Sequence, residues 1–303
     1  MRIVSRPDFD GIICAVLLKD TEDITKDTLW VEPNDMQKGL IQIESDDIVA
    51  NLPYNRNCGM WFDHHFTNQN FFSFKGEFRI APSAAGIIYN YYDKKLYRRD
   101  YEELVYETDR IDSADLTADE VNTPENFPYV LVSMTVNGRD KADAPYWDKL
   151  VDLFRNHSID EVMQDEEVKR RCDFVVEQNK QYKEQLKSHT RIESGVAVTD
   201  FRSFKEPPRG NRFLVYSMYP ESYVQMKIAH HPEIEGKTIV SVGHSIFNRT
   251  CNVNVGLMLS QFEGGGHRGA GSCTFSYFRE NEFIKRMLDI LKANESNEPE
   301  SES

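Results

Sequence analysis

The chain has 303 residues, of which 36 are Lys or Arg and 50 are Asp or Glu, and its formal net charge is -14. The length suits two domains of ordinary size, and the negative charge argues against an extended surface for long nucleic acid. Five cysteines occur without Cys-x-x-Cys spacing, and no apolar run approaches the length of a membrane span. We therefore expect free thiols in a soluble, cytoplasmic protein without a membrane partner.

The N-terminal part alternates short apolar runs with polar clusters. The run "RIVS" at 2–5 ends in "RPDFDG" and is followed by an apolar helical segment at 12–20; similar runs lie at 28–35, 46–54 and 58–65. Strand, polar turn and helix is the order of a parallel α/β unit. Because the carboxyl ends of parallel strands meet at one edge of a sheet, we expect the polar clusters to gather there.

The middle of the chain has helical spacing and the last part does not. Apolar periodicity predicts helices over 83–96 and 101–116, and a charged connecting helix over roughly 166–189. Short β-like runs follow at 194–201, 212–219, 237–245, 252–259 and 271–278. We predict an α/β protein with a parallel-sheet domain (1–158), linker helices (159–189), a smaller α/β or α+β domain (190–293) and a disordered polar tail (294–303).

The cluster "WFDHHF" is the first candidate site. Its Asp63, His64 and His65 follow an apolar run. Two adjacent imidazoles cannot both enter the core, and their burial beside a carboxylate costs free energy unless they have partners. A lone histidine would more often be a core residue, but this triplet predicts a site. Asp8 and Asp10, at the end of the first run, are turn residues when taken alone and metal ligands when the triplet lies beside them.

Acidic residues form a third cluster in "ETDRIDSAD". Asp109 and Asp112 lie three residues apart and share one face if the segment is helical. Asp115 reads as a capping or solvated residue. Only one of these carboxylates has to reach the shared edge for the chemistry to work.

The fourth cluster is "EGGGHRGAGS", where glycines surround His267 and Arg268. Backbone N–H groups beside glycines can point at one anion, and the two side chains add charge-assisted donors. A bare triple glycine would indicate only a tight turn. With His-Arg embedded, we predict a phosphate-binding loop made of Gly264, Gly265, Gly266, His267 and Arg268.

In this order, "RPDFDG", "FDHH", "TDRID" and "GGGHRGAGS" resemble the motifs of the DHH phosphoesterase superfamily with its DHH-associated C-terminal domain. The resemblance spans nearly the whole chain. The superfamily includes oligoribonucleases, adenosine bisphosphate phosphatases, cyclic-dinucleotide phosphodiesterases, single-strand exonucleases and exopolyphosphatase-like proteins. It implies a metal-dependent phosphohydrolase that acts on a small phosphorylated substrate, such as a short oligonucleotide, nucleotide bisphosphate, cyclic dinucleotide or short polyphosphate. Manganese is the implied cofactor, with Mg²⁺ or Co²⁺ as alternatives, and a homodimer is left open.

The resemblance also implies roles for single residues. The metal ligands would be Asp8, Asp10, His64 and either Asp109, the first choice, or Asp112, the second. His65 would lie beside the substrate phosphate with Asp63 orienting the histidines, and Arg6 would bind phosphate. Arg249 would join the GGGHR residues in binding the rest of the substrate.

Two positions depart from the family pattern. Val4 stands where the family has a metal-binding histidine, and Asn51 stands where it has a bridging aspartate. These departures imply one metal ion rather than two, unless Glu32, Asn34 or Asp35 substitutes, and for those three a Pro-Asn turn is the preferred interpretation. They also motivate an alternative function, a nucleotide-binding protein with a degenerate metal site and little or no turnover.

Overall fold

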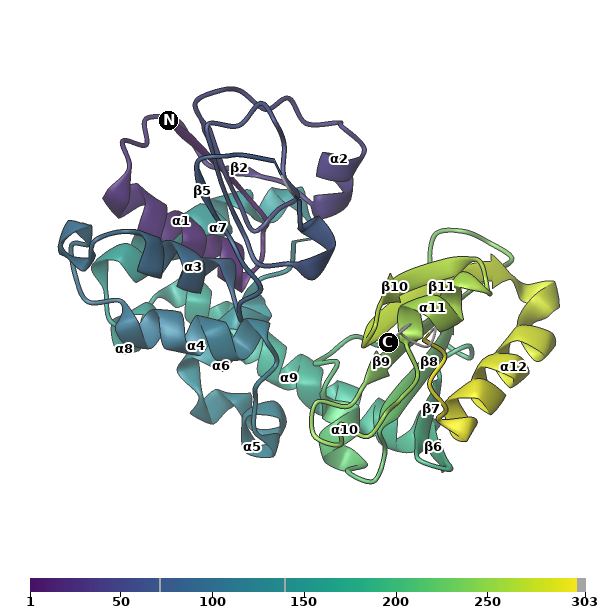
Figure 1. Cartoon of the computed structure of the whole chain (residues 1–303). Coiled ribbons are helices and arrows are strands. Elements are labelled where there is room, and N and C mark those ends of the chain that lie inside the picture. The colour runs from purple at the N-terminus through teal and green to yellow at the C-terminus, as the bar shows by residue number, and fades with distance from the viewer. Residues whose placement is uncertain (71, 139, 299–303) are drawn as a thin grey trace. The chain divides into compact units, whose positions relative to one another are not determined.

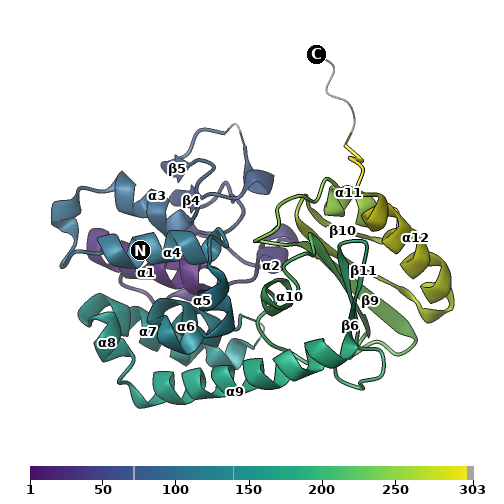
Figure 2. The same cartoon turned by 90° about the horizontal axis from the view of Figure 1, so that it is seen from below.

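The computed structural model describes residues 1–70, 72–138 and 140–298, which form two compact units (Figure 1). The first unit comprises Met1–Leu116 and Pro124–Phe174, and the second comprises Thr117–Thr123 and the chain from Val175 onward. Helix α9 (Glu166–His189) passes from one unit into the other, as Figure 2 shows, and it has the bounds predicted from the sequence. The units therefore divide within this helix, whereas sequence analysis placed the domain boundaries near its ends.

The first unit contains a five-stranded parallel sheet with the order β2-β1-β3-β4-β5. Four of its strands lie in the predicted apolar runs: β1 (Arg2–Ser5), β2 (Leu29–Trp30), β3 (Asp47–Ala50) and β4 (Met60–Asp63). The fifth, β5 (Gly76–Phe78), follows them in the chain and was not predicted. The predicted parallel architecture is confirmed. All of these strands end at the same edge of the sheet.

Different groups cover the two faces of this sheet. Ser5 donates its hydroxyl to the Gly11 carbonyl of α1, so the alternation along β1 turns Val4 to the opposite face. There Val4 is fully buried in an apolar cluster with Val49 and Trp61. On the α1 face, α1 packs against α3, α4 and α7. The helices of this unit are α1 (Phe9–Thr21), α2 (Pro33–Gln37), α3 (Ala84–Tyr91), α4 (Glu102–Asp112), α6 (Pro128–Thr135), α7 (Ala144–Asn156) and α8 (Ile159–Val162).

The second unit contains a six-stranded sheet with the order β10-β11-β9-β8-β7-β6. Neighbouring strands are antiparallel except for the parallel pair β7 and β8. The strands are β6 (Thr190–Glu193), β7 (Val196–Asp200), β8 (Val224–His230), β9 (Lys237–His244), β10 (Gly264–His267) and β11 (Ala270–Ser276). An apolar core joins one face of this sheet to α11 (Val255–Ser260) and α12 (Glu280–Ala293), while α5 (Ala118–Asn122) and α10 (Leu214–Met218) contact each other.

Three sequence expectations for this unit need correction. The runs at 212–219 and 252–259 were expected to be β-like, but they contain helices α10 and α11. The tail was expected to be disordered from residue 294, yet Asn294, Asn297 and Glu298 make hydrogen bonds to the segment 250–254. The tail residues 299–303 lie outside the described residues.

Two other expectations concern the chain as a whole. All five cysteines are free, as predicted. Among the described residues, none of the helices combines the length and the apolar character that a membrane-spanning helix requires.

Candidate functional site

The carboxyl edge of the parallel sheet carries most of the predicted site residues. Asp8 caps the N-terminus of α1 by accepting a hydrogen bond from Gly11 N at 2.9 Å, and Asp10 lies in the first turn of that helix. Asp63 is the last residue of β4, and His64 follows it directly. Asp112, the last residue of α4, comes to the same place from another part of the unit.

Asp10, His64 and Asp112 form a group with the geometry of a metal site. His64 Nε2 lies 3.7 Å from Asp10 Oδ2 and 3.4 Å from Asp112 Oδ2. His64 Nδ1 donates to the Ala81 carbonyl at 2.9 Å, and the buried Nε2 atom has no hydrogen-bond partner among the described residues. A metal-binding histidine typically donates its other ring N–H in this way. The unpartnered nitrogen between two carboxylates therefore fits a divalent cation, and these three residues would hold it.

Asp10 is oriented by the N-terminus of α3. Its two carboxylate oxygens accept the backbone N–H groups of Ala85 at 2.8 Å and Ala84 at 3.0 Å. Ser83 caps this helix by accepting from Gly86 N. Sequence analysis missed the role of this segment, although Ser83 followed by small residues is a readable helix-start signal.

Asp109, the first choice for the fourth ligand, does not belong to the metal group. Its carboxylate accepts a hydrogen bond from the Ser83 hydroxyl and lies against Gly86, so it holds α4 on the start of α3. The second choice, Asp112, faces His64 instead. The difference is physical: the Ser83 hydroxyl already engages Asp109, whereas the Asp112 carboxylate lies beside the unpartnered imidazole nitrogen.

Asp63 holds the His65 ring by a hydrogen bond. The Asp63 Oδ1 atom accepts from His65 Nδ1 at 2.8 Å, and Oδ2 accepts from the Asn68 side chain at 2.6 Å. This arrangement fixes the imidazole and directs Nε2 away from Asp63. Asp63, His64 and His65 could also hold a cation by proximity, but the Asp63 oxygens are already used by N–H donors.

Arg6, Asp8 and Asn51 form a separate polar cluster at this edge. Arg6 Nε lies 3.0 Å from Asp8 Oδ2, and Asn51 donates its Nδ2 to Asp8 Oδ1 at 2.9 Å. The Asn51 backbone has a φ of 55°, a left-handed conformation that asparagine adopts more readily than most residues. Asn51 is almost fully buried, and its Oδ1 atom has no hydrogen-bond partner among the described residues.

The local electrostatics favour a bound cation. Burial raises the pKa of Asp8, against the opposing effect of the Arg6 guanidinium, and the Asp10 charge adds to the increase. Burial, together with the charges of Asp10 and Asp8, raises the pKa of Asp112 well above its usual range. Carboxylates this close repel one another unless a proton or a cation lies between them.

The GGGHR residues lie in the second unit, in a hairpin rather than the expected loop. Gly264–His267 form the edge strand β10, which pairs with β11 so that His267 lies opposite Ala270. Gly266 has a φ of 155°, and a Cβ there would collide with the Ala270 carbonyl. A Cβ at Gly265 would meet nothing within 4 Å. A Cβ at Gly264 would collide with Cys273, so Gly264 and Gly266 serve the hairpin, and Gly265 leaves open space beside His267.

The predicted arginines of this unit are exposed. Arg249 donates Nε to the Ile246 carbonyl at 3.1 Å. Arg268 Nη1 pairs with Glu298 Oε2 at 2.6 Å, and Asn254 donates its amide to Glu298 Oε1 at 3.0 Å. An acidic residue of the C-terminal tail therefore contacts a guanidinium that we expect to bind phosphate.

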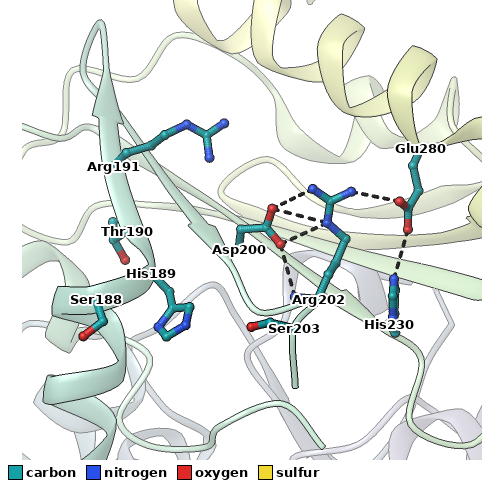
Figure 3. A pocket seen from close by; sticks show the side chains of 9 residues that line it. All are labelled: Ser188, His189, Thr190, Arg191, Asp200, Arg202, Ser203, His230 and Glu280. Atoms are coloured by element: carbon teal, nitrogen blue, oxygen red, sulfur yellow. Dashed lines mark hydrogen bonds and ion pairs between the residues drawn. The ribbon is translucent and has the colours of Figure 1, made fainter. Parts of the chain in front are cut away.

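A pocket of about 670 Å³ also lies within the second unit (Figure 3). Arg202 lies at its centre and donates to both oxygens of Asp200 and to Glu280, which in turn faces His230. None of the predicted site residues lines it. Because this guanidinium already contacts two carboxylates, the network joins the end of β7 to the start of α12 rather than presenting a free charge to a ligand.

Comparison with solved structures identifies the fold. A pGpG-specific phosphodiesterase, PggH from Vibrio cholerae, is similar with a TM-score of 0.83 and 29% sequence identity, over 97% of this chain and 99% of that one. A DHH-domain protein described as a member of a family of ribosomal proteins has a TM-score of 0.61 at 13% identity, over 97% of this chain and 87% of its own.

RecJ from Thermus thermophilus, in complex with Mn²⁺, has a TM-score of 0.54 at 14% identity, over 96% of this chain and 52% of its own. At these low identities the second and third likenesses show the fold alone. No protein-family model and no curated protein sequence matches the chain.

The fold, the site and the similarity to PggH agree with one another. The similarity to PggH covers both units, and Asp10, His64 and Asp112 meet at the carboxyl edge of the parallel sheet with a geometry that fits a divalent cation. The chain is therefore a metal-dependent phosphohydrolase whose fold is similar to that of DHH-domain proteins.

Proposed function

We propose that the chain hydrolyses the phosphodiester bond of a short linear dinucleotide of the pGpG type. The likeness to PggH over nearly the full length of both chains supports this substrate class. The observation that carries the proposal is the unpartnered Nε2 atom of His64, which faces the carboxylates of Asp10 and Asp112. Cyclic dinucleotides, nucleotide bisphosphates and short polyphosphate are the alternatives.

We propose manganese as the cation, and one ion rather than two. A ligand set of two carboxylates and one imidazole suits Mn²⁺, with Mg²⁺ and Co²⁺ as alternatives. The RecJ structures contain Mn²⁺ or Mg²⁺, which is compatible with this choice. A divalent ion held by Asp10, His64 and Asp112 would neutralise phosphate charge and lower the pKa of water.

The side chains around this position have separable tasks. His65 donates Nδ1–H to Asp63, so its Nε2 atom faces away from that carboxylate; with both ring nitrogens protonated, Nε2–H would donate to a phosphate oxygen or give its proton to the leaving group. Asp63 keeps that orientation, and the hydrogen bond from Asn68 keeps Asp63 in place. In the second unit, Arg249, His267 and Arg268 are exposed donors suited to a phosphate group, with Gly264, Gly265 and Gly266 providing the backbone of the hairpin.

The test is a substrate panel with the purified protein and Mn²⁺. We expect release of GMP from pGpG, detected by chromatography, and slower or no release of nucleotide from a cyclic dinucleotide and of phosphate from adenosine bisphosphate and short polyphosphate. His65→Ala should lower the rate by roughly 100- to 1,000-fold, the usual effect of losing one preorganised donor.

His157→Ala is the matched control, because that exposed histidine lies in the same unit outside the site. Equal activity of the two variants would point to a contaminating phosphatase. Tight binding of pGpG without turnover, with Mn²⁺, Co²⁺ or Mg²⁺ supplied, would favour the alternative function of a nucleotide-binding protein.

A further inference from the structure

We infer that Arg6 takes the place of a second metal ion, by binding the substrate phosphate with the two terminal nitrogens of its guanidinium. This inference rests on the proposed function and gives a residue of the chain the charge-neutralising task that the second ion has in a two-metal phosphoesterase. It follows from the hydrogen bonds and the ion pair that the Arg6, Asp8 and Asn51 side chains make.

The Asp8 carboxylate already contacts three nitrogen donors. Its Oδ1 atom accepts from Gly11 N and from Asn51 Nδ2, each at 2.9 Å, and its Oδ2 atom faces Arg6 Nε at 3.0 Å. A carboxylate oxygen has two lone pairs, so both positions on Oδ1 are occupied. Three of the four acceptor positions of the Asp8 carboxylate are therefore taken, and a second ion could reach only the remaining position on Oδ2, beside the Arg6 guanidinium.

The other ligands of a second ion are missing. Val4 is fully buried among apolar side chains, and Asn51 presents its N–H rather than a negative charge to Asp8. Among the described residues, the groups of acidic, His and Cys side chains close enough to hold an ion do not include Asp8. Asp35, a candidate substitute, lies 3.4 Å from Lys141.

Arg6 is held in a way that leaves it able to bind an anion. Its Nε atom is fixed by Asp8, its side chain is 37% exposed, and its terminal nitrogens have no hydrogen-bond partner within the described ranges. The planar fork of a guanidinium matches two phosphate oxygens. Arg6 and one divalent ion together balance the charges of Asp8, Asp10 and Asp112.

The first experiment measures metal content and phosphate binding on the full chain. We expect one Mn²⁺ per chain by elemental analysis, for the natural protein and for Arg6→Ala. Calorimetric titration of the Mn²⁺-loaded protein with inorganic phosphate should show binding weakened by about 10- to 100-fold in Arg6→Ala, and partly restored in Arg6→Lys. Arg170→Ala is the control, because Arg170 is 75% exposed and its nearest acid lies 3.9 Å away.

The second experiment tries to restore the missing ion. The double variant Arg6→Ala, Asn51→Asp frees Asp8 and adds an acid beside it, so we expect it to bind two ions. Asn51→Asp alone, checked for folding by circular dichroism, should remain at one ion while Arg6 still holds Asp8.

The outcomes separate the inference from the proposed function. Two tightly bound ions in the natural protein would overturn the inference and leave the hydrolase proposal intact. Unchanged phosphate binding in Arg6→Ala would do the same. A natural protein that binds no ion at all would instead remove the proposed function, and the inference with it.

Discussion

His64 and His65 are neighbours in the chain, with ring centres 4.1 Å apart, yet their hydrogen bonds give them different tasks. His64 donates Nδ1 to the Ala81 carbonyl and turns Nε2 toward Asp10 and Asp112. His65 donates Nδ1 to Asp63 instead. At the residue scale, the acceptor of the Nδ1 hydrogen bond distinguishes the histidine that we propose as a metal ligand from the one that we propose as a phosphate partner.

Removing the Asp112 carboxylate should remove the metal. Asp112→Asn replaces a charged ligand with a neutral one, so we expect Mn²⁺ affinity to fall by at least about 100-fold, the upper end of the range for outer partners of metal sites. Asp109→Asn, which alters the hydrogen bond with Ser83, should lower the Mn²⁺ affinity by less than about tenfold. Calorimetric titration with Mn²⁺ measures both.

Asp115→Asn is the control, because Asp115 is exposed and lies outside the metal group. If Asp109→Asn lost as much affinity as Asp112→Asn, the assignment of Asp112 would be wrong. Sequence reasoning could not choose between the two, because they share a helix face. The choice depends on Ser83, which is distant in the chain and engages only one of them.

The pH dependence of the metal-free protein offers another check on Asp112. Burial, with the charges of Asp10 and Asp8, raises its pKa in the folded state. The stability that this proton contributes is fully present below about pH 4, the ordinary carboxyl range, and is lost as the pH rises through the raised folded pKa. The melting temperature with chelator present should therefore fall with rising pH more steeply than in Asp112→Asn.

A thermal melt series from acid to neutral pH compares the two proteins directly. Above the raised pKa, Mn²⁺ should stabilise the natural protein and have little effect on Asp112→Asn, because the ion replaces the lost proton between the carboxylates. A natural protein with the shallower pH dependence of the two would contradict this account of the site.

At the scale of secondary-structure elements, the spacing of apolar residues predicted most strands of the parallel sheet in the first unit. Each strand of its parallel sheet up to β4 is a short apolar run that ends in a polar cluster, so periodicity and edge position carried the information. In the second unit the strand β8 was missed, although Val224, Met226 and Ile228 alternate with polar residues and are buried.

Helices α10 and α11 were wrongly expected to be β-like for a common reason. Both segments are short and rich in Val, Phe or Tyr, which favour strands, and tertiary contacts override that propensity. Asn254 caps α11 by accepting from Leu257 N, and Tyr216 of α10 donates to the Gly243 carbonyl. The Asn254 cap was a readable signal, whereas the Tyr216 contact requires the folded sheet.

The contact between the C-terminal tail and the β10–β11 hairpin leads to a prediction at this scale. Glu298 pairs with Arg268, so a phosphate bound at this guanidinium, as we propose, would have to displace the tail. Glu298→Gln should strengthen binding of inorganic phosphate about two- to fivefold, a small gain because exposed ion pairs contribute little. Calorimetry at low salt measures it, with Glu295→Gln as the matched control. Weaker binding in Glu298→Gln would argue against the competition.

The whole molecule combines an acidic surface with a small number of local cationic groups. Its formal net charge of -14 opposes the long-range attraction on which binding of long nucleic acid depends. We propose that Arg6 in one unit, and Arg249 and Arg268 in the other, bind individual phosphates. This distribution of charge fits a phosphohydrolase of short nucleotides better than an enzyme that tracks along a polymer.

The account depends most directly on the metal position, and anomalous diffraction from crystals grown with Mn²⁺ measures it. With data collected at the manganese absorption edge, we predict a single strong peak within coordination distance of His64 Nε2 and of the carboxylates of Asp10 and Asp112. A strongest peak beside Asp63 and His65, or an absence of any peak at the carboxyl edge of the parallel sheet, would contradict it.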